Sequence, residues 1–212
     1  MMRHLKLCLV YLTGALFAVG ATSAIGAAPA IDMATVAKGQ VLRGRFEQTR
    51  ELKGFDAPLK SNGSFVVAPG RGLIWRVDTP FPMTTIMSSS GLLQDVNGQE
   101  ALRVPANKLP FVTKLYEMLA GALAGDLAAL SSTFEITRKD DSKGWRFTMV
   151  PHKADDPNMP LKSIAVRGQK FVEEVIMVKD NGDKERLVLI DQKLAKSDPL
   201  PDEEKLLARV GK

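Results

Sequence analysis

Short strand-like runs separated by turn residues recur between residues 45 and 192, and they limit the folds that this chain can adopt. The runs lie at 45–52, 62–68, 73–77, 83–88, 92–96, 133–139, 145–151, 161–167, 171–179 and 184–192. Turn signals such as Pro69-Gly70, Asn97-Gly98 and Asp180-Asn181-Gly182-Asp183 stand between them. Strands at such regular spacing predict a meandering antiparallel sheet, and a sheet of this size must close, split or curl.

Helical periodicity interrupts the strand pattern. A short helix is predicted at the front, where Asp32 can serve as the N-cap. Its apolar side would consist of Ile31, Met33 or Ala34, Val41 and Leu42. A second helix begins at Pro110, with a further turn or two at 127–130, and a short charged helix at 202–209 ends the chain. The predicted fold class is therefore mainly β: a curled, unclosed antiparallel barrel, or half-barrel, capped by helices in its open mouth.

Residues 1–30 have the three regions of a secretory signal peptide. A basic start with Arg3 and Lys6 precedes the apolar run 7–19, and small residues follow up to position 30. Cleavage is plausible after Ala24, Ala28 or Ala30. We therefore expect an exported, soluble domain, residues 31–212, as the mature protein. A retained membrane anchor is the alternative, but the apolar run is shorter than the ~20 residues that a span needs.

Composition narrows the chemistry. The signal segment holds two of the 29 basic side chains and none of the 24 acidic ones, so the mature chain is only weakly basic. No arginine patch is interleaved with aromatics, and we expect no nucleic-acid binding. The single cysteine, Cys8, lies in the signal segment, too early for lipidation, and excludes an internal disulfide.

No motif favours an enzyme. His152 is the only histidine of the mature chain and lies in a loop rich in Asp, Pro and Asn. No Gly-x-Ser-x-Gly elbow is present, and the acidic pairs Asp140-Asp141 and Asp155-Asp156 are typical of surface turns. The apolar positions are more informative: Phe65 and Val67 share one face of a strand, and Leu73, Trp75 and Val77 share one face of the next. These faces form either an ordinary core or the wall of a ligand cavity.

Several short motifs follow one another in a fixed order. They are Arg45-Phe46-Glu47-Gln48, Gly63-Ser64-Phe65-Val66-Val67, Pro69-Gly70-Arg71, Leu73-Ile74-Trp75 with Thr79-Pro80, Ser90-Gly91, Pro110-Phe111, Phe147-Thr148-Met149-Val150-Pro151, Leu161-Lys162-Ser163-Ile164 and the segment 175–182. Over most of residues 33–192, this set resembles the family of periplasmic outer-membrane lipoprotein carriers, LolA and its LolA-like relatives.

The resemblance implies a helix-capped half-barrel that binds the acyl chains of lipoproteins and ferries them from the inner to the outer membrane. It implies no cofactor, no metal and no covalent chemistry. The expected partners are an inner-membrane transporter that releases the cargo and an outer-membrane acceptor lipoprotein, and we expect the carrier to be a monomer. We predict that the acyl-chain cavity is lined by Phe46, Phe65, Val67, Leu73, Trp75, Phe111, Leu115 and Leu119. Arg71 is the candidate for a latch that closes the helical lid.

The chain also departs from the family pattern. The family has an Arg directly before the Pro of the loop that precedes the Trp strand, whereas here Arg71 follows Pro69. The segment 54–60 and the tail after Gln192 differ as well. A divergent carrier of a glycolipid or another acylated molecule therefore stays open, as do an envelope lipid sensor, a small-molecule enzyme on the same half-barrel and a purely structural envelope protein.

Overall fold

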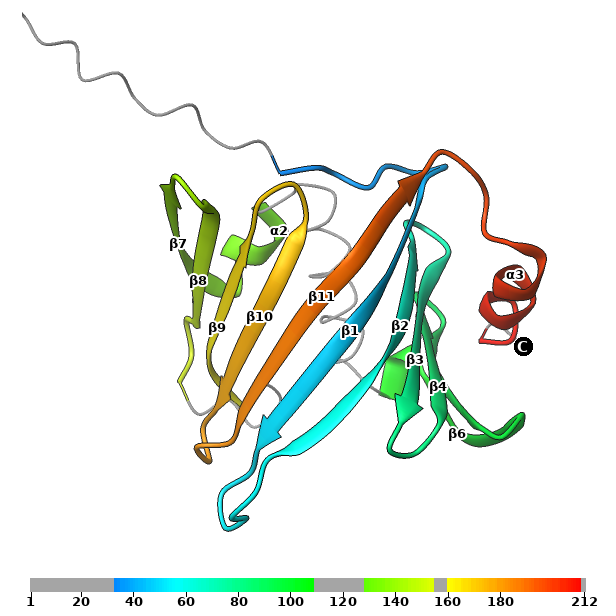
Figure 1. The fold of residues 1–212 in the computed structure, drawn as a ribbon, viewed down its shortest axis with the longest axis horizontal. Helices are drawn as coiled ribbons and strands as arrows, with labels where there is room; N and C mark the ends of the chain where they lie inside the picture. Colours follow the sequence, from blue (N-terminus) through cyan, green and yellow to red (C-terminus); the bar gives the residue numbers. More distant parts are fainter. Residues whose placement is uncertain (1–32, 109–127, 155–159, 211–212) are drawn as a thin grey trace, which may run out of the picture.

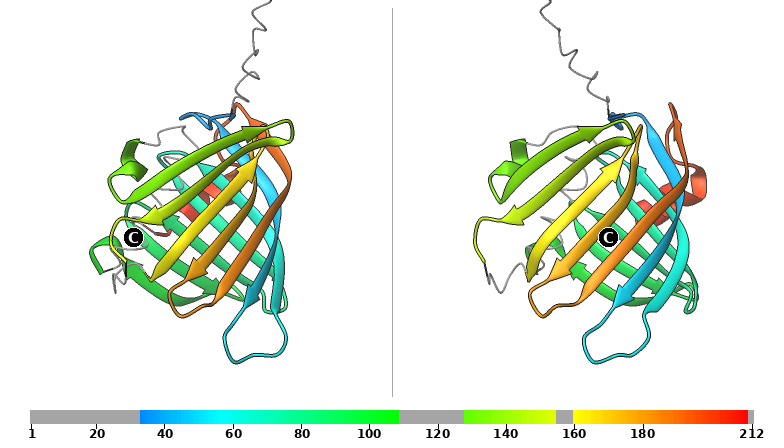
Figure 2. Two further views of the ribbon diagram at one scale, coloured as in Figure 1. Left: turned by 90° about the vertical axis from the view of Figure 1, so that its left-hand side faces the viewer. Right: turned by 60° about the vertical axis from the view of Figure 1, so that its left-hand side comes forward.

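A single antiparallel sheet dominates the computed structural model, which describes residues 33–108, 128–154 and 160–210 (Figure 1). The strand order is β6-β5-β4-β3-β2-β1-β11-β10-β9-β8-β7. The strands are β1 (Val41–Glu51), β2 (Leu59–Ala68), β3 (Gly72–Thr79), β4 (Met83–Ser88), β5 (Gly91–Val96), β6 (Gln99–Pro105), β7 (Phe134–Asp141), β8 (Gly144–Pro151), β9 (Leu161–Gly168), β10 (Val172–Lys179) and β11 (Lys184–Ala195). Within the described ranges no pairing joins β6 to β7, so the sheet curls without closing (Figure 2). The predicted half-barrel is confirmed.

The predicted front helix is wrong. Residues 33–40 form no helix, and Val41 and Leu42 begin β1 instead. The two side chains are buried in clusters on opposite faces of the sheet, because successive side chains of a strand point to opposite faces. A strand, β6, also lies where none was predicted.

The short helices lie on both faces of the sheet. Helix α2 (Ala128–Ser131) matches the further turn predicted at 127–130, and its Leu130 packs on the inner face against Phe134 and Met149. Helix α3 (Pro201–Leu207) overlaps the C-terminal helix predicted at 202–209 and lies on the outer side of the barrel (Figure 1). A 3₁₀ turn, η1 (Ala106–Lys108), follows β6. The helix predicted from Pro110, with Phe111, Leu115 and Leu119, lies outside the described residues.

Aromatic rings and glycines alternate on the inner face of the central strands. Phe46 of β1 is paired with Gly63 of β2, and Gly44 of β1 is paired with Phe65 of β2. A Cβ on Gly63 would lie 1.8 Å from the carbonyl oxygen of Arg76 and 2.9 Å from the ring of Phe46, and a Cβ on Gly44 would lie 2.6 Å from the ring of Phe65. Each glycine therefore makes room for a ring from the neighbouring strand, and Trp75 of β3 stacks on both rings, with centroid distances of 3.8 Å to Phe46 and 6.0 Å to Phe65.

Helix α3 covers the outer face of β3, β4 and β5. Leu207 packs with Ile74 and Ile86 in a buried cluster. Arg43 holds Glu203 with two hydrogen bonds, 2.8 Å from Nε to Oε1 and 2.6 Å from Nη2 to Oε2. Further charged contacts along this seam join Arg71 to Glu204, Arg209 to Asp95 at 2.6 Å, and the guanidinium of Arg103 to the carbonyl of Arg209 at 2.9 Å. The helix is thus fixed by one apolar cluster and several charged hydrogen bonds.

The substitution Gly63→Ala should destabilise the fold by about 1–3 kcal/mol, because the new methyl group meets backbone that cannot move without disturbing the β2–β3 ladder. Gly54→Ala is the matched control, since its Cβ would meet nothing within 4 Å and only its positive φ of 91° opposes it. Urea unfolding measures both. Equal losses in the two variants would contradict the packing role of Gly63.

The Arg43–Glu203 pair predicts a pH dependence. Burial alone would raise the pKa of Glu203, but the hydrogen bonds from Arg43 and from the backbone N–H of Leu200 outweigh it and lower that pKa. Because the folded pKa is depressed, the pair stabilises the fold above the unfolded glutamate pKa of about 4.3, and this contribution is lost as pH falls through the folded value.

We therefore expect Glu203→Gln to lower the free energy of unfolding by about 1.5–3 kcal/mol at neutral pH. The difference from the parent should shrink as the pH is lowered below about 4.3, as measured by urea unfolding at several pH values. Asp202→Asn, at the neighbouring and largely exposed position, is the control and should change little at neutral pH. A pH-independent loss in Glu203→Gln would contradict the ion pair.

Candidate ligand-binding site

Five of the predicted cavity residues lie together on the inner face of the sheet. Phe46, Phe65, Val67 and Leu73 are members of one buried cluster, and Trp75 packs against it. The four cluster residues are at most 7% exposed, so in the described structure they form the core under the site. Trp75 is only partly buried and lines a pocket. The three predicted residues of the lid, Phe111, Leu115 and Leu119, lie outside the described residues.

The pocket beside Trp75 has a volume of about 550 Å³. It lies at the end of β1–β4 where the 52–58 and 80–82 loops connect these strands. Its apolar lining residues are Pro58, Leu59, Trp75, Val77, Pro80, Phe81 and Met83, and its polar ones are Gln48, Arg50, Lys60 and Ser61. A mostly apolar concavity of this size with a few polar groups is the usual form of a small-ligand site.

Sequence reasoning missed most of this lining. Val77 was detectable, because it follows Trp75 by two positions on the same strand face. Phe81 and Leu59 carry no such signal, since one lies in a turn and the other begins a strand. They reach the pocket because the β1–β2 and β3–β4 turns lie at the same end of the sheet.

A polar row borders the apolar floor. The hydroxyl of Ser61 on β2 donates to Oε1 of Gln48 on β1 at 2.8 Å, and Nε2 of Gln48 donates to Oε1 of Glu185 on β11 at 2.5 Å. Ser61 is buried, but its hydroxyl is hydrogen-bonded. The inner face therefore contains polar side chains here without leaving a buried polar group unpaired. The pocket therefore has an apolar side toward Trp75 and a polar side toward Gln48, which is suited to an amphiphilic ligand.

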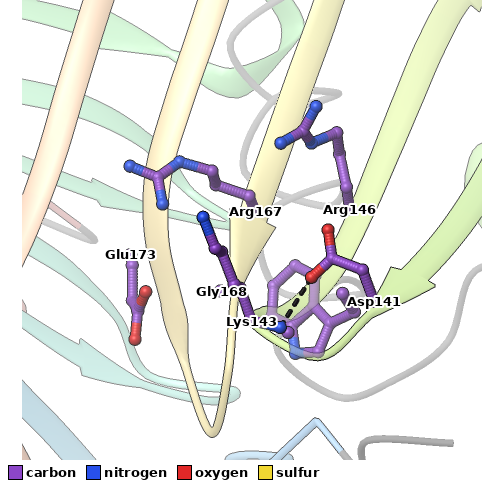
Figure 3. Close-up of a pocket in the computed structure, with 8 residues that line it drawn as sticks. Asp141, Lys143, Arg146, Arg167, Gly168 and Glu173 are labelled. Atoms are coloured by element: carbon purple, nitrogen blue, oxygen red, sulfur yellow. Dashed lines mark hydrogen bonds between the residues drawn. The ribbon is translucent and has the colours of Figure 1, made fainter. Parts of the chain in front are cut away.

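A second concavity at the far edge of the sheet is too small for such a ligand. It is lined by side chains of the β7–β8 and β9–β10 hairpins, including Asp141, Arg146, Arg167 and Glu173 (Figure 3). Its volume is about 60 Å³, enough for one or two water molecules. The backbone N–H of Lys143 closes its rim by donating to Oδ1 of Asp141 at 2.7 Å.

The buried carboxylate near this concavity is accounted for by structure. Glu174 is 7% exposed and lies between Arg167 and Arg186, both of which donate to it. The hydrogen bond from Arg167, helped by that from Arg186, holds the pKa of Glu174 below its usual value. It is a fixed anion that joins β9, β10 and β11, unlike a general acid or base, whose pKa is tuned toward neutrality.

Neither metal ligands nor membrane-spanning helices occur in the part of the chain that the structure describes. No group of three or more His, Cys, Asp or Glu side chains there is placed to hold a metal ion. No helix of these residues is long and apolar enough to cross a membrane.

Arg71, the predicted latch, lies in the turn between β2 and β3. Its guanidinium pairs with the carboxylate of Glu204 on α3, on the outer side of the sheet, and both side chains are half-exposed. The segment 110–122, predicted to form the helix that a latch would hold, lies outside the described residues. The latch assignment therefore stays a prediction.

Comparison with known proteins finds likeness in fold only. No protein-family model and no curated protein matches the chain. Among solved structures, a LolA superfamily protein from Nitrosomonas europaea is similar at 9% identity and a TM-score of 0.39, over 79% of this chain and 90% of that one. The MucA/MucB complex of Pseudomonas aeruginosa gives 10% identity and a TM-score of 0.44, over 78% and 55%. LprF from Mycobacterium bovis is similar at 12% identity and a TM-score of 0.30, over 74% of this chain and 87% of that one. At these values, the function has to be argued from the residues of this chain.

Proposed function

We propose that this protein is a carrier that binds acyl chains on the inner face of its half-barrel. The observation that carries the proposal is the partly open Trp75, which stacks on a buried aromatic core and forms the floor of an apolar pocket of about 550 Å³. The motifs that resemble LolA-like carriers, around Phe46, Phe65 and Trp75, converge at this floor. A concave apolar surface that stays partly open to solvent is typical of a site that an apolar ligand covers.

The cargo that we propose is an acylated lipoprotein, carried through the periplasm from an inner-membrane transporter to an outer-membrane acceptor. This finer assignment rests on the sequence resemblance and on the predicted signal peptide, whose removal would leave residues 31–212 as the working domain. The protein would act as a transport chaperone without covalent chemistry or a cofactor. The polar row of Ser61, Gln48 and Glu185 fits the head of an amphiphile, so another acylated lipid is the alternative cargo.

The substitution Val77→Glu tests acyl-chain binding. A carboxylate in the apolar part of the pocket either loses hydration or must be protonated when a chain enters, and either cost weakens binding. We expect about tenfold or greater loss of affinity for palmitate, which corresponds to at least about 1.4 kcal/mol. Titration calorimetry measures the affinity, and circular dichroism checks the fold.

Val150→Glu is the matched control, because Val150 is an exposed valine of the same strand type on the outer face of β8. Its palmitate affinity should equal that of the parent. In the parent, palmitate should also change the tryptophan fluorescence, and Trp75→Phe should abolish that change while Trp145 remains. Absence of palmitate binding to the parent would refute the proposed function.

The latch prediction concerns Arg71. If this arginine holds a lid shut over the empty pocket, Arg71→Leu should bind palmitate more tightly, because less binding energy is spent on opening. The guanidinium is half-exposed, so the gain should stay within about 1 kcal/mol, or up to about fivefold in affinity. Glu204→Gln breaks the observed ion pair but keeps Arg71, and it should leave the affinity unchanged. An equal effect of both variants would assign Arg71 to the attachment of α3 instead.

A further inference from the structure

The most exposed aromatic side chains of the described structure lie at one end of the half-barrel. Phe81 is 82% exposed in the loop between β3 and β4, and Phe55 is 65% exposed in the loop between β1 and β2. Leu59, also exposed, directly follows the loop between β1 and β2. Isolated exposed apolar side chains are common, but two large aromatic side chains on neighbouring loops are not explained by the packing of the core.

The two loops border the mouth of the Trp75 pocket. Phe81 and Leu59 line the pocket, together with Pro58 and Pro80. The β1–β2 hairpin continues past the end of β3, because Asn62 is the last β2 residue paired with β3 while β1 and β2 remain paired to Leu59. Figures 1 and 2 show this hairpin as the part of the described fold that projects farthest at this end. Phe55 is therefore carried beyond the pocket mouth.

Basic side chains accompany the exposed apolar ones. Residues 50–60 contain Arg50, Lys53 and Lys60 against Glu51 and Asp56, and Arg50 and Lys60 lie at the pocket. Long basic side chains lay their apolar stems along a hydrophobic surface and keep the charge in the polar layer above it. This combination of exposed aromatic side chains and long basic side chains matches the headgroup region of a bilayer.

We propose that this end of the half-barrel, defined by residues 50–60 and 80–82, binds the surface of a lipid bilayer. Phe55 and Phe81 insert at the level of the headgroups, and the pocket mouth then opens toward the membrane. A lipid surface fits better than a protein partner, because aromatic side chains on separate projecting loops do not form the continuous, complementary patch that a protein interface needs. A fluid bilayer accommodates single side chains, and aromatic rings favour its interface.

The experiment is flotation of the mature protein with vesicles of phosphatidylcholine containing phosphatidylglycerol. We expect the parent to float with the vesicles and Phe55→Ser to reduce the partition coefficient about fivefold or more. Leu200→Ser is the matched control, since Leu200 is 57% exposed but lies beside α3, away from the two loops, and it should leave the partition unchanged. Phe55→Trp should keep the partition, and its tryptophan emission should shift to the blue when vesicles are added.

The outcomes separate this proposal from the proposed function. Phe55 does not line the pocket, so Phe55→Ser should bind palmitate in solution as the parent does. Failure of the parent to bind vesicles, or equal partition of the parent and Phe55→Ser, would overturn the membrane site even if palmitate is bound. Vesicle binding that depends on Phe55 would support it even if palmitate is not bound.

Discussion

The packing of aromatic rings over glycines on β1, β2 and β3 is the constraint on which the rest of the molecule depends. Gly44 and Gly63 have no side chain, which leaves room for the rings of Phe65 and Phe46 on the inner face. Trp75 stacks on both rings. A larger residue at Gly63 would collide with the backbone of β3, so the ring arrangement and the strand pairing require each other. The same contact forms the core of the half-barrel and leaves one face of Trp75 at the pocket.

The apolar part of the outer face is covered by the C-terminal segment of the chain. A curled sheet exposes its convex side, and here the apolar part of that side, around Ile74, Ile86 and Leu93, is covered by α3 and the residues that follow it. Charged hydrogen bonds such as Arg43 to Glu203 then orient the helix without adding apolar surface. The outer face is therefore closed by the protein itself, whereas the inner face carries the pocket beside Trp75.

Local sequence signals predicted most of the strands but not all of the residues that line the pocket. Turn residues and alternation located ten of the strands, whereas β6 was missed because its residues are mostly exposed at an edge of the sheet and its polar and apolar residues do not alternate. The prediction of a front helix was wrong because two adjacent apolar residues, Val41 and Leu42, fit one side of a helix as well as the two faces of a buried strand. The motif glycines and aromatics marked the floor of the site. The 52–58 and 80–82 loops lie at one end of the meander, but no periodic pattern assigns their side chains to the pocket mouth.

The arrangement also fits the proposed carrier role, in which an apolar ligand has to be bound and then released. Most of the apolar inner face under the floor is buried by the protein itself, as the near-complete burial of Phe46 and Phe65 shows, so the empty protein does not depend on a ligand for its core. Under the proposed function, the residues that would gain burial from an acyl chain are Trp75, Val77 and their neighbours at the mouth. Because burial contributes about 25 cal/mol per Å², limiting the open apolar area limits the affinity. A carrier needs this balance, since a site that bound its cargo through the whole core could not pass it on.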